Sequence, residues 1–386
     1  MRQPRALPLA SLACVVAIAC GPIGTQGTST EGDGADAGGG SGGGSSGSGG
    51  GGGDDAAAPG ETGAGGSGGG DAGSGGSSTD QAAPGGYHVV GNAIIDAHGA
   101  PHRFHGLDRP SLEWSGTGDH LSQADYALMA SWKANVVRIA LNQDFWLQAS
   151  PSYAPGYAQT VDQQIQWAEA AGLDVVLDLH WSDKGDFSTK PAQQRMADAH
   201  SLTFWQEVAT RYKGDGRVLF ELYNEPHDVP WSVWLSGGPS GDGFTVTGMQ
   251  QLYDAVRGAG AENLVLCGGL QFAYDLSAAA QAPVHGHNIV YATHPYNQPN
   301  KQPANWDAGF GNLTALYPVM ATEFGDTGSC AGDYYSALIA YADAHGMSWS
   351  GWAWYPSGCT FPSLVTDWNG TPTAAGQVVK SALLAY

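Results

Sequence analysis

The feature that most restricts the fold is a regular alternation of short apolar runs with segments of helical periodicity, which extends from about residue 100 to the end of the chain. Eight runs are near-continuous in β-branched and aromatic residues, as is typical of parallel strands covered on both faces. These predicted strands are 102–107, 134–141, 173–180, 217–223, 263–269, 288–294, 317–324 and 347–354. Helices are predicted at 123–133 (capped by Ser122), 160–171, 192–213, 246–259, 332–345 and 373–385, with weaker patterns at 272–280 and 301–315. Before them, two apolar runs around Gly91-Asn92 predict a β-hairpin.

Eight strand–helix units within one domain predict an α/β fold, a (β/α)8 TIM barrel that occupies residues 87–386. A doubly wound open sheet is the alternative. It fits less well, because no glycine-rich phosphate loop follows the first strand.

The residues before the barrel are predicted to be a targeting segment followed by a flexible linker. A basic start and an apolar run predict a signal peptide over residues 1–19, and Ala17-Ile18-Ala19-Cys20-Gly21 resembles a bacterial lipoprotein cleavage box with Cys20 as the lipidated residue. Plain secretion is the alternative. Residues 21–86 hold 29 of the 59 glycines and little that could be buried, so 20–86 is predicted to be a disordered, Gly/Ser/Asp-rich linker. We therefore expect an extracellular or cell-surface protein, attached to a membrane only through a possible lipid anchor.

Charge and cysteine content limit the partners. Fifteen basic and 36 acidic residues give a formal net charge of −21, which repels phosphate backbones and excludes nucleic acid as a partner. Cys330 and Cys359 lie in loop-like contexts of an exported chain, so a disulfide between them is expected. Cys267 reads as a small buried side chain. No Cys/His spacing resembles a zinc site, and neither a metal nor another cofactor is expected.

Polar residues follow the predicted strands where each one ends. In a barrel of this kind the reactive groups gather at the carboxyl ends of the strands. These ends supply Arg138, His180, Asn224, Glu225, His294, Tyr296, Glu323, Trp352 and Trp354. Glu225 and Glu323 end the fourth and seventh strands, which face each other across the axis. A protonated and an ionised glutamic acid placed in this way suit the cleavage of a glycosidic bond with retention of configuration.

The segment Val218-Leu-Phe-Glu-Leu-Tyr-Asn-Glu-Pro-His227 resembles the Asn-Glu-Pro signature of glycoside hydrolase family 5, the cellulase family, and the resemblance covers 87–386. It implies that Glu225 is the acid/base, that Asn224 holds the sugar 2-hydroxyl and that Glu323 is the nucleophile. Arg138 and Tyr296 would then hydrogen-bond Glu323. His294 would lie near the acid/base, and His180 would complete the polar ring.

Tryptophans are the expected contacts to the sugar faces. The resemblance implies one tryptophan on the eighth strand as the floor of the central sugar site; Trp352 is favoured and Trp354 is the alternative. Trp114, Trp181, Trp231, Trp234 and Trp306 are each either sugar platforms or loop packing, whereas Trp132, Trp167 and Trp205 read as core.

The sequence thus predicts a monomeric retaining endo-β-1,4-glucanase that acts on a β-linked polysaccharide or oligosaccharide. A β-mannanase or another β-glycanase on the same barrel is the first alternative. A non-catalytic carbohydrate-binding surface protein is the second.

Overall fold

The computed structural model describes residues 82–83 and 85–386. The predicted signal peptide, the predicted lipidation site at Cys20 and nearly all of the predicted linker lie outside these residues. Among the described helices, none has the length and apolar character that crossing a membrane requires.

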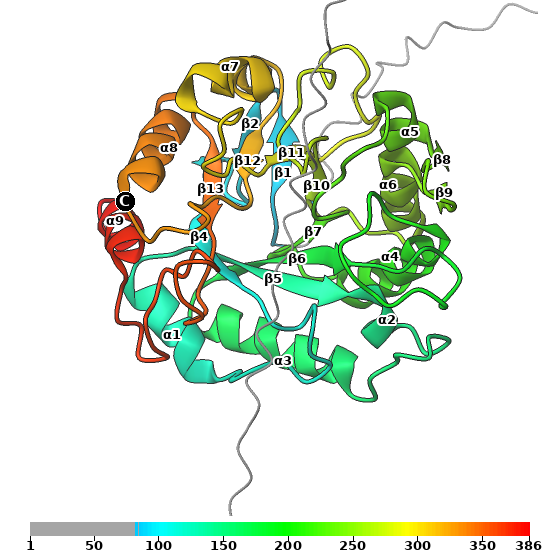
Figure 1. Ribbon diagram of the computed structural model, residues 1–386, viewed down its shortest axis with the longest axis horizontal. Coiled ribbons are helices and arrows are strands. Elements are labelled where there is room, and N and C mark those ends of the chain that lie inside the picture. Colours follow the sequence, from blue (N-terminus) through cyan, green and yellow to red (C-terminus); the bar gives the residue numbers. More distant parts are fainter. Residues whose placement is uncertain (1–81, 84) are drawn as a thin grey trace, which may run out of the picture. The chain divides into compact units, whose positions relative to one another are not determined.

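Eight parallel strands close into a barrel, and helices surround it (Figure 1). In ring order the strands are β4 (His105–Arg109), β5 (Val136–Asn142), β6 (Asp174–Trp181), β7 (Val218–Glu221), β10 (Val265–Gly268), β11 (Ile289–Thr293), β12 (Val319–Ala321) and β13 (Ser348–Gly351). The predicted (β/α)8 barrel is confirmed, and each predicted strand overlaps an observed one. Close packing of neighbouring strands explains Gly106 in β4, because a Cβ there would lie 2.0 Å from the carbonyl oxygen of Val136.

The outer layer contains most of the predicted helices, with shifted ends. The α-helices are α1 (Gln123–Ser131), α2 (Gln143–Trp146), α3 (Tyr157–Ala170), α4 (Ala199–Tyr212), α5 (Trp231–Ser236), α6 (Met249–Gly258), α7 (Trp306–Gly309), α8 (Asp333–Ala344) and α9 (Ala374–Leu383), and the 3-10 helices are η1 (Pro303–Asn305) and η2 (Gly311–Ala315). Ser122 caps α1 as predicted, since its side chain accepts a hydrogen bond from the amide of Asp125.

Two of the helix predictions need correction. The long helix expected over 192–213 begins only at Ala199, because Asp198 caps α4 in a capping box with Ser201 and residues 192–197 form a loop. No helix forms at 272–280. Gln271, Phe272 and Ala273 instead adopt left-handed backbone conformations, with φ between 55° and 60°, and make a compact turn.

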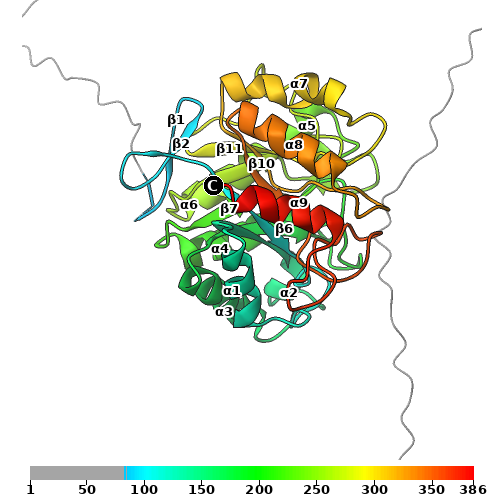
Figure 2. The same cartoon turned by 90° about the vertical axis from the view of Figure 1, so that its left-hand side faces the viewer.

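The predicted hairpin is confirmed and closes one end of the barrel (Figure 2). Strands β1 (His88–Val90) and β2 (Ala93–Ile95) pair in antiparallel fashion, and β3 (Pro101–His102) adds a third strand. Two short strands, β8 (Gly238–Pro239) and β9 (Thr245–Val246), form a separate ribbon. Ile94 of the hairpin packs with Phe104 into an apolar cluster inside the barrel.

That cluster fills the half of the barrel interior nearer the hairpin. It contains Ile94, Phe104, Val136, Val176, Leu219, Leu264, Leu266, Val290, Ala292 and Met320. The intervening residues of the same strands, such as Val137 and Leu177, point outward and pack beneath the helices in a second, larger core. Because side chains alternate along a strand, the inward positions two residues further on lie at the other end of the barrel.

Candidate active site

Beyond the apolar cluster, the next inward-facing positions of the barrel strands carry charged side chains. Val136 is followed after two residues by Arg138, Val176 by Asp178, and Leu219 by Glu221. All three charged side chains are buried, with at most 1% of their surface exposed. The alternation that places an apolar core in one half of the barrel therefore places a charged layer in the other.

Arg138 is the centre of this layer. Its Nη1 donates a hydrogen bond of 2.7 Å to Oε1 of Glu323, and its Nε donates one of 2.5 Å to Oε2 of Glu221. Its Nη2 lies 2.7 Å from Oδ1 of Asn224 and 2.9 Å from Oδ2 of Asp178. Burial opposes the charge of Arg138, but these carboxylates outweigh burial and raise its pKa well above the usual value. Asp178 and Glu221 hold this arginine in place.

Glu323 follows β12 and is held at both of its oxygens. Arg138 contacts Oε1, and the hydroxyl of Tyr296 donates a hydrogen bond of 2.7 Å to Oε2. Only 4% of the Glu323 side chain is exposed, against 20% for Glu225. Glu323 is therefore fixed in orientation, whereas Glu225 is the more accessible carboxyl group.

His294 links Glu225 to the charged layer. Its Nδ1 lies 3.1 Å from Oε1 of Glu225, and its Nε2 lies 2.9 Å from Oγ1 of Thr322. The hydroxyl of Thr322 donates in turn to Oε1 of Glu221, at 2.6 Å. His294 thus lies among Glu221, Glu225 and Glu323, as the resemblance implied for its place near Glu225.

These contacts shift the pKa values of His294 and Glu225 in opposite directions. Burial alone lowers the pKa of His294, but Glu323, Glu221 and Glu225 outweigh it and raise the value to about 10. Burial alone raises the pKa of Glu225, but the hydrogen bond and charge of His294, with help from Lys301, bring it to about 2. In the free protein the proton shared by His294 and Glu225 therefore resides on the imidazole, and not on the carboxyl group that the sequence led us to expect to be protonated.

The remaining polar residues complete the ring. Nδ1 of His180 lies 2.6 Å from Oδ2 of Asp178, and the hydrogen bond and charge of that aspartate overcome burial and raise the His180 pKa. Nδ2 of Asn224 donates to Oε1 of Gln193 at 2.8 Å and lies 3.4 Å from Nε2 of His180. Gln193 also donates to the carbonyl oxygen of Glu225, so the loop before α4 borders the site.

One atom each of Glu225, His294 and Glu323 lies within 4.8 Å of the other two. A second group of this kind, Asp183, Asp198 and His200, lies outside the ring. The amide of Gln143 donates to both aspartates, at 3.1 and 3.0 Å. Asp198 also caps α4. This second group orders the loop between β6 and α4.

An aromatic wall borders the charged layer. Trp352, 7% exposed, packs with Phe361, and half-buried Trp114, Tyr296 and Tyr355 lie against them. The ring of Trp352 is nearly parallel to that of His180, with centroids 5.7 Å apart. Cys330 and Cys359 form the expected disulfide, which joins the loops that follow β12 and β13.

The structure decides between the two tryptophans of the eighth strand. Trp354 is fully buried and packs edge-on against Trp132, so its assignment as a substrate-binding residue was wrong. Trp354 lies beyond the end of β13 at Gly351, where the alternation of the strand no longer applies, and its ring packs in the outer core. Trp352 holds the position on the active face.

The other loop tryptophans fall into two groups, buried and half-buried. Trp234 and Trp306 are buried and donate hydrogen bonds to the carbonyl oxygens of Gly268 and Lys301, which identifies them as loop packing. Trp231 is half-buried and stacks on Trp234. Trp181 ends β6 and is also half-buried. Trp114 and Trp181 therefore keep accessible surface on the active face.

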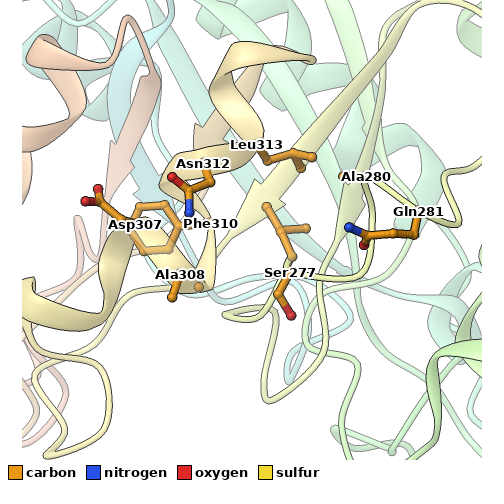
Figure 3. Close-up of a pocket in the computed structure, with 10 residues that line it drawn as sticks. Ser277, Ala280, Gln281, Asp307, Ala308, Phe310, Asn312 and Leu313 are labelled. Atoms are coloured by element: carbon orange, nitrogen blue, oxygen red, sulfur yellow. The ribbon is translucent and has the colours of Figure 1, made fainter.

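The pockets on the outside of the barrel do not share these residues. One, of about 350 Å³, is lined by the segments 276–281 and 307–313 and is shown in Figure 3. Another, of about 440 Å³, lies beside Phe187 and His200. Neither contains a member of the charged layer.

A family model described as "Cellulase (glycosyl hydrolase family 5)" matches residues 95–358, which are most of the barrel. The chain belongs to glycosyl hydrolase family 5. Among the relatives of this family member, endoglucanase E-5 of Thermobifida fusca is 27% identical over 319 residues, which are 76% of this chain and 63% of that protein. An endoglucanase of Paenibacillus polymyxa is 25% identical over 345 residues, covering 74% and 84% of the two chains.

Solved structures show the same family fold. A beta-glucanase of Saccharophagus degradans superposes with a TM-score of 0.65 at 23% identity, covering 78% of this chain and 93% of that one. The catalytic domain of the Thermobifida fusca endoglucanase gives a TM-score of 0.62 at 23% identity, covering 78% and 97%.

Several residues of this family 5 site were missed by sequence reasoning. Thr322 precedes Glu323 just after β12. Asp108 lies one residue before the end of the first barrel strand, and Nη1 of Arg138 lies 3.6 Å from its Oδ1. Extending the strand-end argument to the first strand and to adjacent positions would have found both residues. Gln193 and Lys301 lie in irregular loops, at the start of the segments 192–213 and 301–315, whose patterns predicted helices.

Proposed function

We propose that this chain is a retaining glycoside hydrolase that cleaves internal β-1,4 bonds of a β-glucan such as cellulose. The observation that carries the proposal is the approach of a Glu225 oxygen to a Glu323 oxygen within 4.8 Å. Double displacement uses carboxyl groups about 5–5.5 Å apart, whereas inversion needs roughly 6.5–9.5 Å to admit a water molecule. The endoglucanase names of the relatives support the choice of a β-glucan.

In the first step a Glu323 oxygen attacks the anomeric carbon, and the bond from that carbon to the glycosidic oxygen breaks. Glu225 donates its proton to the departing oxygen, which leaves as a hydroxyl group. The product is a glycosyl ester on Glu323 and an ionised Glu225.

In the second step Glu225 takes a proton from a water molecule, whose oxygen attacks the same carbon. The ester bond breaks and Glu323 is released as a carboxylate. Two inversions at one carbon retain the β configuration. Arg138 and Tyr296 keep Glu323 oriented before the attack.

The His294–Glu225 pair supplies the proton. The imidazole holds it in the free protein, at 3.1 Å from the Glu225 oxygen. A bound sugar covers the exposed part of Glu225 and excludes water, which raises the pKa of that carboxyl group. The proton then lies on Glu225 when the glycosidic oxygen needs it.

Sugar recognition is assigned to the aromatic wall and the polar ring. Trp352 forms the floor beside the anomeric carbon, Trp114 and Trp181 stack on neighbouring sugars, and Asn224 holds the 2-hydroxyl. His180 contacts the same sugar. Because this ring does not read the configuration at C2, a β-mannan is the alternative substrate.

A panel of carboxymethylcellulose, mixed-linkage glucan and galactomannan, with product analysis, tests the substrate. We expect rapid loss of viscosity with the glucans and products that first appear as the β anomer in proton NMR. Hydrolysis of galactomannan alone would support the mannanase alternative. Binding without hydrolysis of any polymer would support the non-catalytic alternative.

The nucleophile assignment has its own test. A Glu323→Ala variant supplied with azide and an activated aryl β-cellobioside is expected to form the α-glycosyl azide. A β-configured azide would contradict the assignment.

We further propose that the enzyme acts outside the cell as a monomeric catalytic domain, residues 87–386, on a linker of residues 20–86 that follows a signal peptide of residues 1–19. Lipidation of Cys20 would tether it to the outer membrane. A Cys20→Ser variant is expected to move from the membrane fraction to the medium. Equal membrane association of the variant would rule out this anchor.

A further inference from the structure

Lys301, in the loop between β11 and η1, is a buried cation that the mechanism above does not use. Only 3% of its surface is exposed. Its Nζ donates a hydrogen bond of 3.0 Å to the carbonyl oxygen of Gln271 and lies 5.1 Å from the centre of the Tyr274 ring. Burial of an ammonium group is costly unless it has partners, so its place here requires an explanation.

The partner of Lys301 is the turn 270–275, which contacts the backbone of His294 and the backbone of Pro226, the residue after Glu225. The amide of Phe272 donates to the carbonyl oxygen of Pro226, next to Glu225, at 3.0 Å, and the carbonyl oxygen of Ala273 accepts from the amide of His294 at 3.3 Å. The turn thus contacts the backbone beside Glu225 and the backbone of His294.

Aromatic stacking adds to this link. The Phe272 ring stacks on His227, with centroids 4.2 Å apart, and Nδ1 of His227 lies 2.9 Å from the carbonyl oxygen of Glu225. Three consecutive residues of the turn, Gln271 to Ala273, have positive φ values. Non-glycine residues hold that conformation only where surrounding contacts impose it. The ammonium of Lys301 provides such a contact.

The charge of Lys301 also acts on the carboxylates. Glu225 is faced by His294, which directly follows β11, by Lys301 from the next loop, by His180 from β6 and by the carboxyl group of Glu323. Burial lowers the pKa of Lys301 to about 8, although Glu225 and Glu323 act in the opposite direction. The positive charge is therefore present at neutral pH and close enough to both carboxyl groups to interact with them through space.

We propose that Lys301 is a positioning residue for the acid/base, which acts in two ways. Its ammonium holds the 270–275 turn against Pro226 and His294, and its positive charge favours an ionised Glu225. The inference deepens the proposed function and rests on it for the role of Glu225.

The test compares Lys301→Met, which removes the charge at similar length, with Lys301→Arg, which keeps it. Lys380→Met is the matched control, because Lys380 belongs to the outer helix α9. Its ammonium group lies over the ring of Trp132. The readout is the pH profile of kcat/KM on cellotetraose. Loss of a nearby positive charge raises the pKa of the acid, so we expect the basic limb of Lys301→Met to move up by roughly half a unit to one unit. In Lys301→Arg and Lys380→Met the basic limb should stay at its wild-type pH.

A second substrate separates positioning from simple structural damage. Departure of 2,4-dinitrophenolate needs no proton, so 2,4-dinitrophenyl β-cellobioside reports on a first step without acid catalysis. For Lys301→Met we expect kcat/KM to fall about tenfold or more on cellotetraose and less than about threefold on the aryl glycoside. Equal losses on both substrates, or an unmoved basic limb, would overturn the proposal.

A titration of the intact site keeps the proposal testable if Lys301→Met does not fold. The pKa of the Lys301 ammonium, followed by NMR of ¹³C-labelled lysine, is expected to fall in Glu225→Gln, because a nearby negative charge is lost. An unchanged value would overturn the link between the two charges. This titration does not depend on turnover, so it stands apart from a failure of the wild type to hydrolyse any glycan, which would contradict the proposed function itself.

Discussion

The two halves of the barrel interior are built from the same strands and differ completely in chemistry. Near the hairpin the inward positions hold Val136 and Leu219, which belong to an apolar cluster. Two residues further along the same strands they hold Arg138 and Glu221, equally buried but charged. The hydrogen-bonded ladder continues through both halves. The polarity of the side chains alone separates a region that stabilises the fold from one suited to catalysis.

The charged half carries an energetic cost that the apolar half does not. Removing ions from water is unfavourable even when they are paired, and replacing such a network by apolar residues often increases stability. The apolar cluster contributes through burial and close packing. We therefore expect substitutions in the two halves to affect different quantities.

The largest effect is expected for Glu323→Gln in the charged half. The amide keeps the shape of the side chain and removes the nucleophile, so kcat on a soluble β-glucan should fall on the order of 10⁴-fold or more. Calorimetry should find the melting temperature close to that of the wild type, since one buried charge is removed. A strong loss of stability with substantial residual turnover would contradict the separation of the two halves.

Leu219→Ala should show the opposite pattern. The variant leaves a cavity in the apolar cluster, and the free energy of unfolding should fall by about 2–5 kcal/mol in denaturant titrations. Well below the melting temperature, kcat should stay within a few-fold of the wild-type value. A loss of kcat comparable to that of Glu323→Gln in folded protein would mean that the apolar half also sets the geometry of the site.

Substitutions of Trp352 and Trp354 test the same contrast between site and core, at the end of one strand. Trp352→Ala removes a sugar contact, so kcat/KM should fall roughly 10- to 100-fold with little change in stability. Trp354→Ala opens the outer core, where loss of a large aromatic costs about 3–5 kcal/mol, and should leave kcat/KM of the folded fraction nearly unchanged. Interchanged effects would reverse our assignment of the two rings.

The smallest effect expected is a pH dependence of stability that belongs to the charged half. The pKa of His294 is raised from 6.5 to about 10 in the folded protein. A raised pKa stabilises the fold fully below the unfolded value of 6.5, and this contribution is lost as the pH rises through 10. Melting temperatures of the wild type and His294→Gln should therefore converge between pH 6.5 and 10. A constant difference would show that His294 is not protonated in the folded state.

The site residues that the sequence predicted lie on or next to strands, whereas several of those that it missed lie in loops. Arg138 and His180 lie at inward positions of apolar strands and Glu323 follows one, and in a closed barrel these positions meet on one face, so a linear pattern was enough to bring them together. Gln193 and Lys301 reach the site from loops whose course depends on caps and turns. The helix predicted over 192–213 concealed Gln193, because its pattern did not reveal that Asp198 starts α4.

The sequence by itself determined the barrel, the charged face at its strand ends and the pair Glu225 and Glu323, because alternation along a strand and the parallel order of the strands leave few other arrangements. The tertiary structure alone decided that Trp354 faces the outer core, that the proton resides on His294 in the free protein and that the charge of Lys301 acts on Glu225. These outcomes depend on burial and on charges brought together from distant parts of the chain. Desolvation and Coulomb interactions act through space, and the order of residues along a chain does not record those distances.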